Sequence, residues 1–278
     1  MKISNFVSAI VAARFLAVAA SAEKDTHLEE AKAIFEWVSG MGGGYVNPKL
    51  ELRREIPDNP NSPMGVYATE TIEIGEDVVK VPDEAMISTD DWNEVTSQMM
   101  CGTVRAVARE MRLGADSEYA PYAIYLNGES DASIPSIWSK PAQDLLLQVL
   151  KTEREELLPP EDPVSFIARW FDWCKGDPND TFGIRAAVMV VARADDAYMI
   201  PAYDNLNHRN GNWTNTITTH EDDEYHRTTS TKTIPAGDQI YISYNLCEEC
   251  GGRKMGYGTA GKFLYQSGFQ DQKIFATT

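Results

Sequence analysis

Apolar residues recur three and four positions apart in several stretches of the chain. In residues 27–38 this spacing places Leu28, Ile34 and Val38 on one helical face, and Gly40 follows as a helix end. The same spacing predicts four further helices. They span residues 95–111, 138–150, 164–174 and 182–194.

Short alternating runs, bounded by Gly, Pro and Asp, predict strands before and after these helices. Strands are expected at 49–53, 64–69, 77–81, 214–219, 227–233 and 240–244. Pro82 ends the third strand, and the acidic tip 221–224 joins the fourth and fifth strands in a hairpin. Residues 91–175 therefore form a mainly helical segment between two segments rich in strands.

The chain has 278 residues, an ordinary apolar fraction and a formal net charge of −17. This length allows one large domain or two modest ones. A surface this acidic repels phosphate backbones and anionic membranes. We therefore expect no direct nucleic-acid binding, and a basic protein is the more plausible partner; the oligomeric state is not predicted.

Residues 1–22 form an acid-free, mostly apolar leader that ends in Ala20-Ser21-Ala22. This pattern predicts a signal peptide and entry into the secretory pathway. Arg14 interrupts the apolar run, so a plastid or mitochondrial transit peptide is the alternative. No later stretch approaches the ~18 apolar residues of a membrane span. Asn179 and Asn212 each begin a glycosylation sequon.

The four cysteines, Cys101, Cys174, Cys247 and Cys250, are not expected to form a disulfide framework in a chain of this size. Cys247 and Cys250 have the spacing of half a zinc knuckle or a redox pair. No second pair at ligand spacing accompanies them. We therefore expect two thiols, or a local disulfide in a surface loop, and no metal ligand is assigned.

Two segments carry the candidate chemistry. The first ends in Asp204-x-x-Asn207-His208, where short polar side chains bond to the backbone and hold an irregular loop. The second is a Pro-Ala-Gly turn followed by a strand that ends at Tyr244.

These two segments, in this order, resemble the SET-domain protein methyltransferases. The resemblance is to the branch containing the Rubisco large-subunit lysine methyltransferase and the actin-histidine methyltransferase. The run from Gly65 to Glu76 resembles the opening hairpin of that domain, 117–122 a segment of the branch's helical insert, and 261–269 its closing segment. The chain departs from the family pattern at Met64, Ala192, Asn245 and Ser267.

The resemblance implies an α+β fold, the SET-domain fold, with small curved β-sheets, a pseudoknot and an inserted helical subdomain. It divides the chain into a leader 1–22, a first SET segment 23–90, a helical insert 91–180, a second SET segment 181–270 and a tail 271–278. The family's helical carboxy-terminal domain, which binds the protein substrate, is expected to be missing.

The resemblance also implies S-adenosyl-L-methionine as cofactor. Its expected contacts are Gly65, Val66, Arg193, Asp204, Asn207, His208, Tyr244 and Phe269. Arg193 would meet the cofactor carboxylate, with a solvated pair to Asp195 as the alternative reading. Tyr244 would be catalytic, pointing its phenol at the methyl group and orienting the acceptor amine. The pseudoknot would carry Tyr244 beneath the Asn207-His208 loop.

The implied activity is methyl transfer to a lysine, or less often a histidine, of a protein substrate. A lysine must first lose its proton, which at neutral pH costs about 4.6 kcal/mol for a pKa of ~10.4. Two other readings stay open. One is a catalytically weak SET fold that acts as a protein-binding module, and the other is a zinc-dependent or redox protein built on Cys247 and Cys250.

Overall fold

The computed structural model describes residues 25–57, 59–89, 95–96, 99–129, 138–150, 166–195, 197–209, 211–221 and 224–244. The leader 1–22, the Cys247 and Cys250 pair, the closing segment with Phe269 and the tail lie outside the described residues. Within the described residues, no helix has the length and apolar character that crossing a membrane requires.

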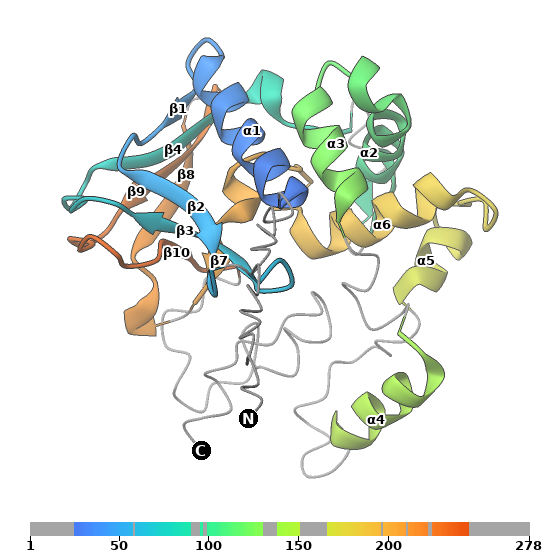
Figure 1. Cartoon of the computed structure of the whole chain (residues 1–278). Coiled ribbons are helices and arrows are strands. Elements are labelled where there is room, and N and C mark those ends of the chain that lie inside the picture. Colours follow the sequence, from blue (N-terminus) through green and yellow to red (C-terminus); the bar gives the residue numbers. More distant parts are fainter. Residues whose placement is uncertain are drawn as a thin grey trace, which may run out of the picture.

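The largest sheet has four antiparallel strands in the order β1-β4-β9-β8 (Figure 1). Their bounds are β1 Tyr45–Val46, β4 Asp77–Pro82, β8 Thr216–Glu221 and β9 Tyr225–Ser230. The predicted hairpin around the acidic tip is confirmed as β8 and β9. Strand β4 lies inside the sheet, and Val78, Val79 and Val81 are fully buried. The extra strand β1 was not predicted.

A second sheet pairs β2 (Leu50–Arg54) with β3 (Met64–Ala68) in antiparallel register. The hairpin expected around the run from Gly65 to Glu76 is therefore wrong, because β3 pairs with β2 while β4 pairs with β1 and β9. The proline-rich loop returns the chain for this pairing, and Glu55 N–H donates to the Pro63 carbonyl at 2.8 Å.

The described helices are α1 Thr26–Gly40, α2 Cys101–Leu113, α3 Ala120–Gly128, α4 Lys140–Leu150, α5 Phe166–Asp172 and α6 Thr181–Arg193. The helix predicted from residue 95 is wrong at its start. Strands β5 (Val95–Thr96) and β6 (Met99–Met100) pair there, and α2 begins only at Cys101.

Helix α1 lies between the strands and the helical part of the molecule (Figure 1). It packs on α3 on one side and on β1 and β2 on the other, while α2 packs on α6. Its buried residues are Ala31, Ile34, Phe35 and Val38, which include Ile34 and Val38 of the predicted face, while Leu28 of that face is only partly buried. Helix α1 thus joins both halves to one hydrophobic core.

Cys101 and Cys174 form a disulfide with a Cα–Cα distance of 5.3 Å. This corrects the expectation that the cysteines form no disulfide framework. Cysteine spacing in the sequence indicates disulfides only in short secreted chains. Cys101 and Cys174 lie 73 positions apart, and the packing of the helical insert brings them together. The bond joins the start of α2 to the segment that leads into α6.

The segment that delivers Tyr244 lies beside the Asn-His loop. Strand β10 (Tyr241–Ile242) pairs with β7 (Asn207–His208) in parallel, with Tyr241 opposite Asn207 and Ile242 opposite His208. Parallel neighbours require a crossover connection, and here the β8–β9 hairpin lies within it. The pairing places the segment that ends at Tyr244 beside the Asn207-His208 loop, as the predicted pseudoknot requires.

Candidate active site

A cavity of about 440 Å³ opens where α6, β7 and β10 meet the end of α3 and the start of α1. Its wall takes residues from both strand-rich segments and from the helical insert. The lining residues used below are His27, Met64, Tyr125, Glu129, Arg193, Asp204, Asn207 and Tyr244. Four predicted site residues therefore share one cavity, although they come from positions 193 to 244.

Arg193 ends α6 and points its guanidinium into an acidic surround. Its Nη1 lies 3.2 Å from Asp204 Oδ2, its Nη2 donates to the Tyr125 hydroxyl at 3.1 Å, and the same nitrogen is ion-paired with Glu129. The reading of a solvated pair with Asp195 is wrong, since Asp195 instead contacts His226 at 3.2 Å. Arg193 is thus held by partners that fix its direction.

The side chain of Asp204 is fully buried and positions Arg193. Its Oδ2 accepts from the Tyr122 hydroxyl at 2.7 Å, and its Oδ1 accepts from Asn205 Nδ2 at 2.8 Å. Burial raises the pKa of Asp204, while Arg193 and the Tyr122 hydrogen bond pull this pKa down. Tyr122 belongs to the segment that resembles the family insert, so its hydroxyl links that insert to the cavity.

Asn207 lies at the cavity wall on β7. Its Nδ2 donates to the backbone carbonyl of Met64 at 2.8 Å, across the 143 positions that separate them. The amide is therefore fixed by the start of β3, and its oxygen, for which the described residues show no hydrogen-bond partner, is an acceptor group for a ligand. Met64 also lines the cavity, in place of the glycine that the family pattern has at this position.

Tyr244 lines the cavity beside β7. Its hydroxyl donates to the Leu206 carbonyl at 2.6 Å, and its backbone N–H donates to His208 Nδ1 at 3.0 Å. Burial raises the pKa of the Tyr244 phenol above its ordinary value; Asp204 adds to this shift and Arg193 opposes it. The phenol is therefore protonated at neutral pH and serves as a hydrogen-bond donor, not as a base.

Three of the predicted cofactor contacts lie beside the cavity and do not line it. Val66 is fully buried in the core, and a Cβ at Gly65 would lie 2.1 Å from Gln239 Nε2. His208 turns its ring toward Tyr244, with 5.1 Å between ring centroids. Gly65 thus allows close packing against Gln239, and His208 braces the backbone of Tyr244.

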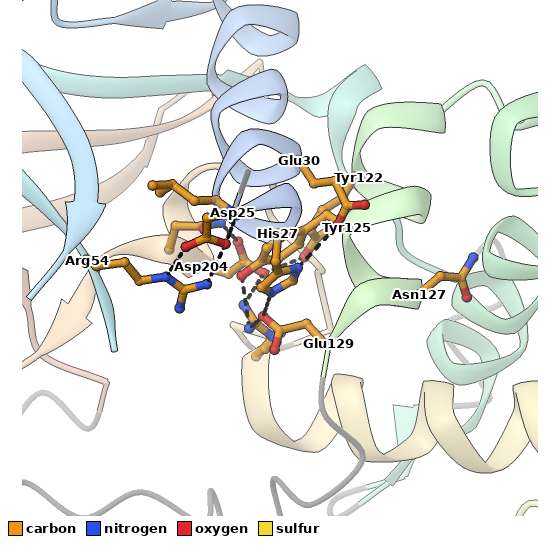
Figure 2. A network of polar contacts seen from close by, with 12 residues as sticks. Asp25, His27, Glu30, Arg54, Tyr122, Tyr125, Asn127, Glu129 and Asp204 are labelled. Carbon is orange, nitrogen blue, oxygen red and sulfur yellow. Dashed lines mark hydrogen bonds and ion pairs between the residues drawn. The ribbon is translucent and has the colours of Figure 1, made fainter. Parts of the chain in front are cut away.

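Sequence reasoning missed the residues that the first helix and the end of α3 bring to the cavity. Figure 2 shows His27 and Glu129 converging beside Tyr125. His27 Nε2 lies 3.4 Å from Glu129 Oε1, and the His27 ring stacks on Tyr125 at 4.7 Å between centroids. No motif joins a helix-start His to an Arg some 166 positions later, so only the packed structure reveals this group.

The chain belongs to the SET-domain family, because the family model described as "SET domain" matches residues 64–245. Two solved structures are similar in fold. "Structure of Rubisco LSMT bound to AdoMet" is 16% identical with a TM-score of 0.58, and "Crystal structure of the SET domain of LSMT bound to Lysine and AdoHcy" is 15% identical with a TM-score of 0.56.

Both matches cover 87% of this chain, but only 56% and 57% of the respective relatives. At this identity the likeness establishes the SET-domain fold. It confirms the predicted α+β class with small sheets and helices. None of the curated proteins compared matches the chain.

Proposed function

We propose that this protein is an S-adenosyl-L-methionine-dependent protein methyltransferase whose acceptor is a lysine side chain. The observation that carries the proposal is a single cavity lined by Arg193, Asn207 and Tyr244 in a SET-domain fold. The similar structures are bound to AdoMet in one case and to lysine and AdoHcy in the other. Those ligands support the same chemistry here.

The residues present fit the proposed cofactor. Arg193 offers a planar guanidinium to a carboxylate, and Asp204 with Tyr125 fixes its direction. Asn207 offers an amide oxygen whose orientation is set by the bond to Met64. When bound, the cofactor supplies a methyl group already activated on a sulfonium, so the protein has mainly to align donor and acceptor.

Tyr244 orients the acceptor. Its phenol is protonated and held at the cavity wall by Leu206, so its oxygen can accept from an incoming amine. Alignment of reacting atoms at ~3–3.5 Å lowers such a barrier by about 7–11 kcal/mol. No nucleophilic side chain is needed for this transfer.

The acceptor must be neutral when it reacts. Transfer from water into a confined channel disfavours the ammonium form of lysine and lowers its pKa. A histidine acceptor, with an ordinary pKa of ~6.5, is already mostly neutral. Lysine is proposed because it is the commoner acceptor in the resembling family.

The test is incubation of the purified protein with tritiated S-adenosylmethionine and a proteome extract, followed by identification of the labelled residue. Labelled lysine is the expected result, and S-adenosylhomocysteine should suppress it. Saturable cofactor binding with no labelled protein would contradict the proposal. That result would favour the protein-binding module, which the departures at Met64 and Ala192 suggest.

We also propose that the protein folds in an oxidising compartment of the secretory pathway. The Cys101–Cys174 disulfide supports this, because such bonds persist mainly in oxidising environments. The sequon residues Asn179 and Asn212 are both exposed. A mobility shift of the expressed protein on glycosidase treatment would support the proposal, and an unmodified chain with reduced cysteines would contradict it.

A further inference from the structure

Two titratable residues of the cavity wall, Glu129 and His27, have no role in the proposed chemistry. Arg193 carries one positive charge, and the carboxylates of Asp204 and Glu129 both contact it. One positive charge therefore faces two negative ones. A cofactor carboxylate that approaches Arg193 meets a site whose net charge is already unfavourable.

His27 lies at the outer end of this cluster. Its Nε2 is buried and lies 3.4 Å from Glu129 Oε1. The same Glu129 oxygen pairs with Arg193. Protonation of His27 would place a second positive charge beside Glu129 and balance the cluster. Figure 2 shows His27, Tyr125 and Glu129 gathered between the start of α1 and the end of α3.

We propose that His27 is a positioning residue for cofactor binding. This inference rests on the cofactor proposed above. His27 acts through Glu129 to set the net charge that the Arg193 site presents to the cofactor carboxylate. With His27 protonated, Glu129 is shared between two cations and competes less for Arg193. With His27 neutral, Glu129 and Asp204 together oppose the carboxylate.

The other groups around His27 favour its protonated form. From its own helix, Glu30 Oε2 lies 3.2 Å from Nδ1, and Asp25 at the helix start is engaged by Arg54 of β2. From the α3 side, Tyr125 stacks on the ring and Glu129 faces Nε2. The contact with Glu129 raises the pKa of His27, burial opposes this, and Glu30 adds to the rise.

The sign of the effect follows from linkage. A bound carboxylate near His27 stabilises the protonated ring, so binding raises the pKa of His27 further. Cofactor affinity is then highest below the pKa of His27 in the free protein. It falls as the pH rises through the pKa of His27 in the complex.

The experiment is calorimetric titration with S-adenosylhomocysteine between about pH 6 and about pH 8. For the unaltered protein we expect Kd to weaken by about tenfold, the change that one pKa unit of coupling produces. His27→Gln should give a flat profile at the weaker value. Glu129→Gln should also give a flat profile, because the residue that transmits the charge is lost.

Two controls separate this effect from general titration of the protein. 5′-Methylthioadenosine lacks the amino-acid end of the cofactor, so its Kd should not change with pH. His220→Gln removes a histidine that pairs with Asp83 at 3.0 Å and does not line the cavity. This variant should keep the slope of the unaltered protein.

An equal pH slope in the unaltered protein and in His27→Gln would overturn the inference, as would an equal slope for 5′-methylthioadenosine. If the unaltered protein bound S-adenosylhomocysteine with a Kd that did not change with pH, the inference would be overturned but the proposed function would not. If S-adenosylhomocysteine bound at no pH, both the inference and the proposed function would be contradicted.

Discussion

Tyr244 is the residue on which the chemistry of the account depends most. Tyr244→Phe removes a donor to Leu206 and the oxygen that orients the acceptor. We expect turnover to fall by about 10²-fold or more, by analogy with loss of one transition-state hydrogen bond. Cofactor binding should be kept. Both kcat for methyl transfer and Kd for S-adenosylhomocysteine should be measured for the variant and the unaltered protein.

The matched control is Tyr241→Phe. Tyr241 lies three positions earlier, and its hydroxyl donates to Gln239 Oε1 at 2.6 Å, outside the cavity lining. This variant should retain turnover. Near-normal kcat in Tyr244→Phe would remove Tyr244 from its proposed role.

Glu129 should stabilise the folded protein in a pH-dependent way. Burial alone would raise its pKa, but Arg193 and His27 more than offset this and lower it to about 2. Because the folded-state pKa is depressed, the stabilisation is present above the ordinary pKa of 4.5 and is lost as the pH falls toward 2.

Glu129→Gln should therefore lower the free energy of unfolding at neutral pH by about 2–3 kcal/mol. The difference from the unaltered protein should shrink as the pH falls below about 4 in urea unfolding curves. Glu51→Gln changes an exposed carboxylate and should alter stability by less than about 0.5 kcal/mol. If the difference in free energy of unfolding stayed constant between neutral and acid pH, the proposed stabilising role of the Glu129 carboxylate would be contradicted.

Among the elements, α2 and the segment before α6 depend on the Cys101–Cys174 bond. The bond spans 73 positions, and in the chain-entropy model closing such a loop stabilises the fold by about 4 kcal/mol. The double variant Cys101→Ala, Cys174→Ala should lose about this much in the free energy of unfolding. Alkylation of Cys101 or Cys174 in the unreduced, denatured chain would show that the bond is absent.

The elements that could be predicted are those long enough to show a period. Helices α1, α4 and α6 have three or more turns with an apolar face, and the β8–β9 hairpin alternates on both sides of an acidic tip. Strands β1, β5 and β6 are two residues long, so no alternation can mark them. The pairing of β3 with β2 depends on how the whole chain folds, and the sequence of residues 64–81 does not determine it.

The same limit applies to the site. Asn207, Arg193 and Tyr244 were predicted because short motifs mark them, and the structure brings them to one cavity. His27 and Glu129 belong to no motif. They reach the cavity only because α1 packs on α3 and positions its first turn there.

For the whole molecule, the net charge of −17 should influence substrate encounter. Opposite charge steers association, and salt screens this attraction over about 10 Å at 0.1 M. If the substrate is a basic protein, KM should rise several-fold between about 0.05 and about 0.3 M salt while kcat changes little. A neutral peptide with the same acceptor lysine is the control, and a salt-independent KM for the basic substrate would contradict the expectation.

One cavity, built from segments distant in the sequence, is proposed to hold the methyl donor. Photolabelling with radioactive S-adenosylmethionine, followed by peptide mapping, would locate the donor on the chain. We predict label on peptides that contain Arg193, Asn207 or Tyr244, and loss of that label when S-adenosylhomocysteine competes. Competable label found only elsewhere, such as on α4 or on the outer face of α1, would contradict the account.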